Sequence, residues 1–84
     1  MKKWWVYIIE AENGNLYTGI TTDIKRRLEE HKKGKLGAKF FRSSAPKKIL
    51  FQEHFPDRSS ASKREAQIKS WKREKKIKLI QGSL

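Results

Sequence analysis

A single carboxylate falls on an otherwise apolar helical stripe near the end of the chain. Glu65 comes four residues after Ala61 and three before Ile68, while the other faces of this predicted helix are crowded with lysine and arginine. A carboxylate on a stripe that faces the core must be paired, protonated or bound to a metal ion. The sequence therefore leaves two readings of Glu65 open, a metal ligand or a salt bridge to a basic neighbour.

A second polar pair lies on an earlier predicted helix. Arg27 and His31 are four residues apart and project from one face, next to the stripe formed by Ile24 and Leu28. Asp23 lies one turn earlier on the same line. Taken alone, this spacing favours the solvated edge of an amphipathic helix over a chemical site.

Two further placements have both a chemical and a packing interpretation. Tyr7 and Tyr17 flank an Asn-Gly turn, and tyrosines in strands ordinarily pack with their hydroxyls at the surface. Lys39 and Arg42 flank two phenylalanines. Basic residues interleaved with aromatic ones suit a phosphate backbone and unstacked bases, although the phenylalanines could equally belong to the core.

The charge balance indicates the class of partner. The 84 residues include 21 Lys and Arg against 9 Asp and Glu, a formal net charge of +12. A solvated surface needs both signs, so this surplus predicts a polyanion, with nucleic acid ahead of an anionic membrane surface. The sequence contains no cysteine, which excludes disulfides and thiolate metal sites.

The length and the N-terminal segment bound the organisation. A chain of this size predicts one domain over residues 1–84. The apolar run that starts at Trp4 is too short for a signal sequence because Glu10 ends it, and no stretch approaches the length of a membrane span. We therefore expect a cytoplasmic protein with no membrane partner.

The elements that position these residues follow from periodicity and turn residues. In chain order we predict strands over residues 4–11 and 16–21, a helix capped by Thr22 or Asp23 and stopped at Gly34, a basic loop over residues 35–47, a strand over "KKILFQEHF", and a helix from Ser59 or Ser60 to about Leu79. This order, β-β-α-β-α, predicts an α+β fold in which helices flank a three-stranded antiparallel sheet. The first strand is apolar on both faces, which indicates cover on both sides.

Side-chain alternation gives two expectations about the strands. In the third strand, Ile49, Phe51 and Phe55 are expected on one face. In the hairpin, a two-residue Asn13-Gly14 turn would put Tyr7 and Tyr17 on opposite faces. A three-residue loop, Glu12 to Gly14, would put both on one face, with Tyr7 opposite Gly19 and Gly14 at positive φ. Local propensity favours the shorter turn, but a shared site requires the longer loop, and we predict the longer loop.

In order and spacing, these residues resemble the GIY-YIG nuclease superfamily, most closely its small free-standing bacterial members. Trp5-Val6-Tyr7 stands where the family has Gly-Ile-Tyr, and Tyr17-Thr18-Gly19 where it has Tyr-Ile-Gly. Arg27, in "TTDIKRRLEEH", is similar to the catalytic arginine, and His31 to a polar position often held by histidine. "GAKFFR" resembles a segment of the small members, and Glu65 matches the metal-binding glutamate. The resemblance covers nearly the whole chain.

The resemblance implies an endonuclease that hydrolyses phosphodiester bonds in nucleic acid, DNA in the first place, with one Mg²⁺ or Mn²⁺ and no organic cofactor. Glu65 would hold the ion. Arg27 would stabilise developing charge, Tyr17 would orient or deprotonate water, and Tyr7 would hydrogen-bond to Tyr17 or to phosphate.

The remaining residues have smaller implied roles. His31 would carry a proton near neutral pH. Gly19 would let phosphate or metal approach the strand, and Lys39 and Arg42 would bind the backbone. No second domain reads a long sequence, so we expect DNA structure or ends to be recognised.

Two other functions remain open at this level. A non-catalytic basic nucleic-acid-binding module would keep the fold and charge without turnover. A protein that docks on an acidic partner or on the ribosome would bind without competition from DNA. Dispersal of Tyr7, Tyr17, Arg27 and Glu65 over distant surfaces would favour the binding module.

Overall fold

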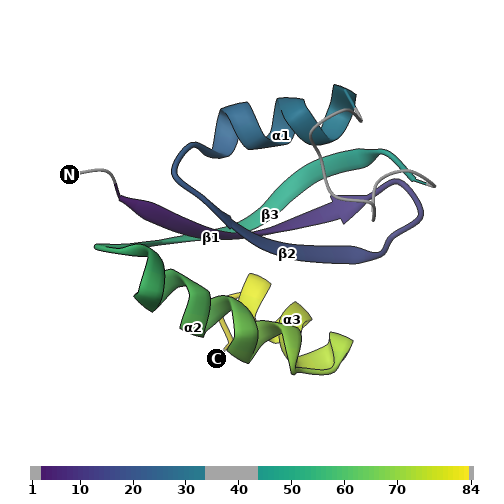
Figure 1. Cartoon of the computed structure of the whole chain (residues 1–84). Helices are drawn as coiled ribbons and strands as arrows, with labels where there is room; N and C mark the ends of the chain where they lie inside the picture. The colour runs from purple at the N-terminus through teal and green to yellow at the C-terminus, as the bar shows by residue number, and fades with distance from the viewer. Residues whose placement is uncertain (1–2, 34–43, 84) are drawn as a thin grey trace.

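The computed structural model describes residues 3–33 and 44–83. Its elements are β1 (Trp4–Ala11), β2 (Leu16–Thr21), α1 (Ile24–Lys33), β3 (Pro46–Phe55), α2 (Arg58–Lys69) and α3 (Arg73–Ile80). The strands form one antiparallel sheet in the order β2-β1-β3, with α1 on one face and α2 and α3 on the other (Figure 1). The predicted α+β architecture is confirmed.

The central strand β1 supplies the core on both faces of the sheet, as its two apolar faces predict. Val6 and Ile8 pack with Ala61 and Ile68 of α2 on one face. On the other face, a second cluster joins β1 to α1 and β3 and consists of Tyr7, Ile9, Ala11, Tyr17, Ile24, Leu28 and Ile49. The two tyrosines therefore lie in the layer between the sheet and α1.

The hairpin adopts the three-residue loop. The Ala11 amide donates to the Asn15 carbonyl at 2.9 Å, and the Gly14 amide donates to the Ala11 carbonyl at 2.9 Å. Gly14 has φ +87°, which a glycine adopts without steric cost. As a result Tyr7 pairs with Gly19 and Ile9 with Tyr17. The register in which both phenols share a face is confirmed.

The prediction that Ile49, Phe51 and Phe55 share a face of β3 is wrong. Ile8 pairs with Phe51 while the next residue, Ile9, pairs with Ile49, so Leu50 is an extra residue in β3. An extra residue of this kind is a β-bulge, and it reverses the alternation beyond it. Ile49 consequently joins the layer beneath α1, whereas Phe51 and Phe55 join the layer beneath α2.

The predicted single C-terminal helix is divided into α2 and α3 by residues 70–72. The Ser70 hydroxyl donates to the Gln67 carbonyl at 2.6 Å, and the Trp71 amide donates to the Ile68 carbonyl at 3.0 Å. A serine that bonds its own backbone competes with helical hydrogen bonding. The turn allows Trp71, Leu79 and Ile80 to pack against the same cluster as Ile68.

The helix starts are set by two aspartates. Asp23 accepts from the Arg26 amide at 3.0 Å, in agreement with one of the two predicted caps of α1. For α2 the cap is Asp57, which accepts from the Ser60 amide at 2.8 Å, and Ser59 and Ser60 lie inside the helix. In the part of the chain that the structure describes, no helix is both long and apolar enough to cross a membrane.

Candidate active site

A buried hydrogen bond between β1 and α1 forms the base of the candidate site. The Tyr7 hydroxyl lies 3.1 Å from Nε2 of His31, and each residue is 1% exposed. Tyr7 reaches this position because it faces α1 from the central strand, and His31 because it lies in the last turn of α1. The bond joins two residues that the sequence separates by 24 positions, a pairing that the sequence analysis did not predict.

Gly19 makes room for the Tyr7 phenol. A Cβ at residue 19 would lie 2.5 Å from the Tyr7 hydroxyl oxygen, 2.7 Å from its Cζ and 3.1 Å from a ring carbon of Tyr17. We expected the missing side chain to admit phosphate or metal. The space above Gly19 is instead taken by Tyr7, and this packing is sufficient reason for a glycine inside the strand.

Burial keeps His31 neutral. Loss of hydration lowers the pKa of the imidazole to about 4, with a further contribution from the Arg27 charge, while Glu30 acts in the opposite direction. This lowered pKa argues against the role of proton carrier near neutral pH that the resemblance implies for His31. At pH 7 the ring has one donor nitrogen and one acceptor nitrogen.

Tyr7 is likewise held in its neutral form. Burial raises the pKa of its hydroxyl, and the neighbouring Tyr17 adds to the increase, whereas a hydrogen bond with Arg27 opposes it. The carboxylate of Glu65 contributes a smaller increase. The phenol thus acts as a hydrogen-bonding group and not as a base at neutral pH.

Arg27 connects the buried pair to the surface of the site. Its Nη1 donates to Oε1 of Glu30 at 3.0 Å, and its guanidinium also hydrogen-bonds Tyr7. Partial burial lowers the pKa of Arg27, but the hydrogen bonds with Glu30 and Tyr7 outweigh that effect, so the net pKa is raised. Arg27 is a fixed positive charge whose orientation is set from two sides.

Tyr17 is the more accessible of the two phenols. It is half-buried, and its ring meets the His31 ring in a T-shaped contact with centroids 5.3 Å apart. The Tyr7 and Tyr17 ring centroids are 6.2 Å apart. Tyr7, Tyr17, Arg27 and His31 therefore form one cluster, as the predicted register requires.

Glu65 lies on the opposite side of the sheet from the tyrosine cluster. It lies on α2, which packs against the other face of the sheet, and its Oε2 is 3.2 Å from Nζ of Lys69. Its side chain is 21% exposed, and its charge acts on the pKa of Tyr7. The salt bridge to a basic neighbour is thus observed, whereas the metal-ligand reading of Glu65 stays a prediction.

The donor set suits only an ion that retains water. Within residues 3–33 and 44–83, no group of three or more His, Cys, Asp or Glu side chains could enclose a metal ion. Mg²⁺ is commonly held by one or two carboxylates, with waters and substrate phosphates completing its shell. A single half-buried carboxylate at Glu65 fits that mode and does not fit a closed structural site.

A cationic cavity of about 300 Å³ adjoins the cluster. It is bounded by β1, β2, α1 and α2 and is lined by Trp4, Ile20, Thr21, Thr22, Arg26, Arg27, Glu30 and Arg58. The guanidinium of Arg58 lies over the Trp4 ring at 5.5 Å from its centroid. The sequence analysis missed Arg26 and Arg58, because a single arginine among 21 basic residues carries no spacing signal. Lys39 and Arg42, two of the predicted contacts, lie outside the described residues.

Comparison with known proteins gives one consistent result. The family model of the GIY-YIG catalytic domain matches residues 3–78. The chain is 45% identical over 80 residues to a UPF0213 protein of Desulfotalea psychrophila, covering 95% of this chain and 73% of that protein. It is 47% identical over 77 residues to a UPF0213 protein of Haloquadratum walsbyi, covering 92% and 85%.

A solved structure has the same fold. The solution NMR structure of the UPF0213 protein BH0048 from Bacillus halodurans superposes with a TM-score of 0.60 at 38% identity. The match covers 94% of this chain and 83% of that chain.

Proposed function

Because this chain belongs to the GIY-YIG catalytic domain family, a nuclease superfamily, we propose that it is a divalent-metal-dependent endonuclease that hydrolyses phosphodiester bonds in DNA. The observation that carries this proposal is the clustering of Tyr7, Tyr17, Arg27 and His31 on one face of the sheet. In this proposal the substrate is recognised by its structure or its ends and not by a long sequence, and the protein works in the cytoplasm.

Glu65 is the proposed ligand of one Mg²⁺ or Mn²⁺. When bound, such an ion offsets charge on the phosphate and favours ionisation of water. The side chain has the exposure that an ion with several waters needs. Release of Lys69 from Glu65 costs little, since the Lys69 side chain is 53% exposed and a helical pair of this spacing contributes about 0.3–0.5 kcal/mol.

Arg27 is the proposed stabiliser of the transition state. Hydrolysis builds negative charge on the non-bridging oxygens, and a guanidinium offers two parallel donors to them. Glu30 and Tyr7 hold the guanidinium before substrate arrives. Arg27 lines the cationic cavity, so a phosphate that enters the cavity can reach its guanidinium.

Different burial gives the two tyrosines different roles. Tyr17, which is half-buried, is the phenol available to orient the attacking water. Tyr7 and His31 are buried and act as positioning residues behind it. Because a guanidinium can only donate, the Tyr7 oxygen accepts from Arg27. The direction of its hydrogen bond with Nε2 of His31 depends on which ring nitrogen of the neutral imidazole carries the proton.

The non-catalytic alternative would be favoured by dispersal of Tyr7, Tyr17, Arg27 and Glu65. The first three lie in one cluster with His31, whereas Glu65 lies on α2, which packs on the other face of the sheet. Within the described residues, Arg26, Arg27 and Arg58 also direct positive charge to the cavity beside the cluster. The charge therefore serves the site as well as general binding.

The test is cleavage of labelled single-stranded, nicked and branched DNA of one length, with Mg²⁺, Mn²⁺ or a chelator. We expect cleavage with either ion, none with the chelator, and a preference among the structures. Binding of all substrates without cleavage under any condition would instead establish the binding module. Competition by matched RNA separates DNA from RNA as the target.

A further inference from the structure

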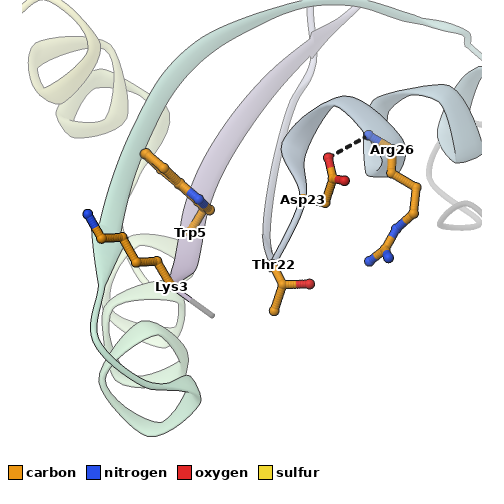
Figure 2. A pocket seen from close by; sticks show the side chains of 5 residues that line it. All are labelled: Lys3, Trp5, Thr22, Asp23 and Arg26. Atoms are coloured by element: carbon orange, nitrogen blue, oxygen red, sulfur yellow. Dashed lines mark hydrogen bonds between the residues drawn. The ribbon is translucent and has the colours of Figure 1, made fainter. Parts of the chain in front are cut away.

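A second cavity lies beside Trp5. It has a volume of about 240 Å³ and is lined by Lys3, Trp5, Thr22, Asp23 and Arg26. Figure 2 shows Lys3 and Trp5 on one side of the opening and Asp23 and Arg26, at the start of α1, on the other. Sites for drug-sized ligands are typically about 300–1,000 Å³, so this cavity has the size for one small planar group.

The position of Trp5 relates this cavity to the catalytic cluster. Trp5 and Tyr7 are two residues apart on β1 and hence share the face that carries α1. Two residues of a strand span about 7 Å. A group bound at Trp5 would thus be a close neighbour of a phosphate held at Arg27.

The two cavities share lining residues at the start of α1. Thr22 and Arg26 line both the Trp5 cavity and the cavity that contains Arg27. The cavities therefore adjoin at these two residues, and an extended chain that crosses them would contact both. This arrangement fits an extended polymer better than a separate small ligand.

The lining combines an aromatic surface with positive charge. The Trp5 indole is half-buried, and a T-shaped contact with His54, at 5.4 Å between centroids, holds the ring without stacking on it. Lys3 and Arg26 supply two cations. The one carboxylate, Asp23, already accepts from the Arg26 amide, as the dashed line in Figure 2 marks.

We infer that the Trp5 cavity is a subsite for the nucleotide next to the scissile phosphate, with its base stacked on the indole and its phosphate bound by Arg26 and Lys3. This inference rests on the proposed function. Stacking on an aromatic side chain tolerates any base, which agrees with recognition of structure and not of sequence. It also requires an unpaired nucleotide at that position, because a base inside a duplex has no free face.

The test compares two oligonucleotides of equal charge without divalent ion, so that cleavage is not needed. One is an oligothymidylate, and the other has the same length and backbone but abasic sugars throughout. We expect Trp5→Leu to weaken oligothymidylate binding by about five- to a hundredfold, and to leave binding of the abasic chain unchanged. Trp5→Phe keeps an aromatic face and should remain close to wild type.

A second pair of variants tests the contribution of positive charge to binding. Arg26→Gln should weaken binding of both oligonucleotides and reduce the slope of log K against log salt by about 1. Lys25→Gln, on the adjacent exposed residue that lines neither cavity, should change less. Circular dichroism checks that each variant is folded.

Three outcomes overturn the inference. Equal losses of both oligonucleotides in folded Trp5→Leu would mean that no base stacks on the indole, as would no loss at all. Failure of the wild type to bind oligothymidylate would exclude an unpaired nucleotide at this position. Cleavage of nicked or branched DNA, measured separately, would leave the proposed nuclease function standing in either case.

Discussion

The Tyr7 hydroxyl occupies the space that a side chain at Gly19 would fill. A Cβ there would lie 2.5 Å from the hydroxyl oxygen, and the same hydroxyl is bonded to buried His31. The missing side chain of Gly19 leaves room for the Tyr7 phenol, which in turn contacts the His31 imidazole and hydrogen-bonds the Arg27 guanidinium. Gly19, the glycine of the second family motif, is therefore needed to make room for Tyr7, the tyrosine of the first.

Gly19→Ala should destabilise the protein by about 1–3 kcal/mol through overpacking, because Tyr7 must move. Gly14→Ala is the control. It meets no atom within 4 Å, and its cost of about 1–2 kcal/mol comes from positive φ alone. In a Tyr7→Leu background the penalty at residue 19 should shrink and that at residue 14 should persist. Equal penalties at residue 19 in both backgrounds, measured by urea unfolding, would contradict the steric account.

His31 should make stability depend on pH. Its pKa is about 4 when folded and about 6.5 when unfolded, so the unfolded chain binds an extra proton between these values. The contribution of about 3 kcal/mol is complete above pH 6.5 and is lost as the pH falls toward 4. Relative to wild type, His31→Gln should lack this loss, whereas His54→Gln, at an exposed residue, should keep it. An NMR titration of His31 with a midpoint near 6.5 would refute the burial argument.

Substitutions of the two tyrosines should have different effects, on stability for Tyr7 and on the rate of cleavage for Tyr17. Tyr7→Phe leaves Nε2 of His31 without its phenol partner and should cost about 1–3 kcal/mol of stability. Tyr17→Phe should lower the single-turnover rate, because it removes the hydroxyl proposed to orient the attacking water, and should cost less stability than Tyr7→Phe, because the Tyr17 side chain is only half-buried. Unfolding curves and single-turnover rates measure the two effects. A stable Tyr7→Phe variant with unchanged activity would remove the positioning role.

Arg27→Lys should fail to restore what Arg27→Ala loses. An ammonium keeps the charge but not the planar pair of donors shared among Glu30, Tyr7 and phosphate. We expect both variants to lose about 10²–10³ in kcat, while Lys25→Ala retains activity. Wild-type rates in Arg27→Lys would show that charge alone suffices.

Local sequence signals predicted most of the fold, and the family resemblance supplied the composition of the cluster. A shared site for Tyr7 and Tyr17 required the longer loop, and the hairpin has it, although the local signal of Asn13-Gly14 favours a shorter one. The extra residue Leu50 was not predictable, since a bulge is decided by pairing with another strand. The helix break at residues 70–72 likewise depends on packing of Trp71 and Leu79 against a core that the sequence does not display.

The electrostatics of the site depended on contacts over long sequence separations. Nothing near His31 in the sequence indicates that it is buried against Tyr7, and burial is what lowers its pKa. The cavity residue Arg58 is recruited by the fold from the start of α2. The position of a residue in a helix predicts the face on which its side chain lies, but it does not predict which residues of another element pack against that face.

The most direct test of the nuclease account is the single-turnover rate of DNA cleavage with Mg²⁺ by Glu65→Gln, with Glu74→Gln on the exposed face of α3 as the matched control. Both variants keep the size of the side chain and remove one negative charge. We predict that Glu65→Gln remains folded, binds DNA as well as wild type and loses about 10²–10³ or more in rate, while Glu74→Gln cleaves normally. Wild-type cleavage by folded Glu65→Gln, or equal rates with and without a chelator, would contradict the account.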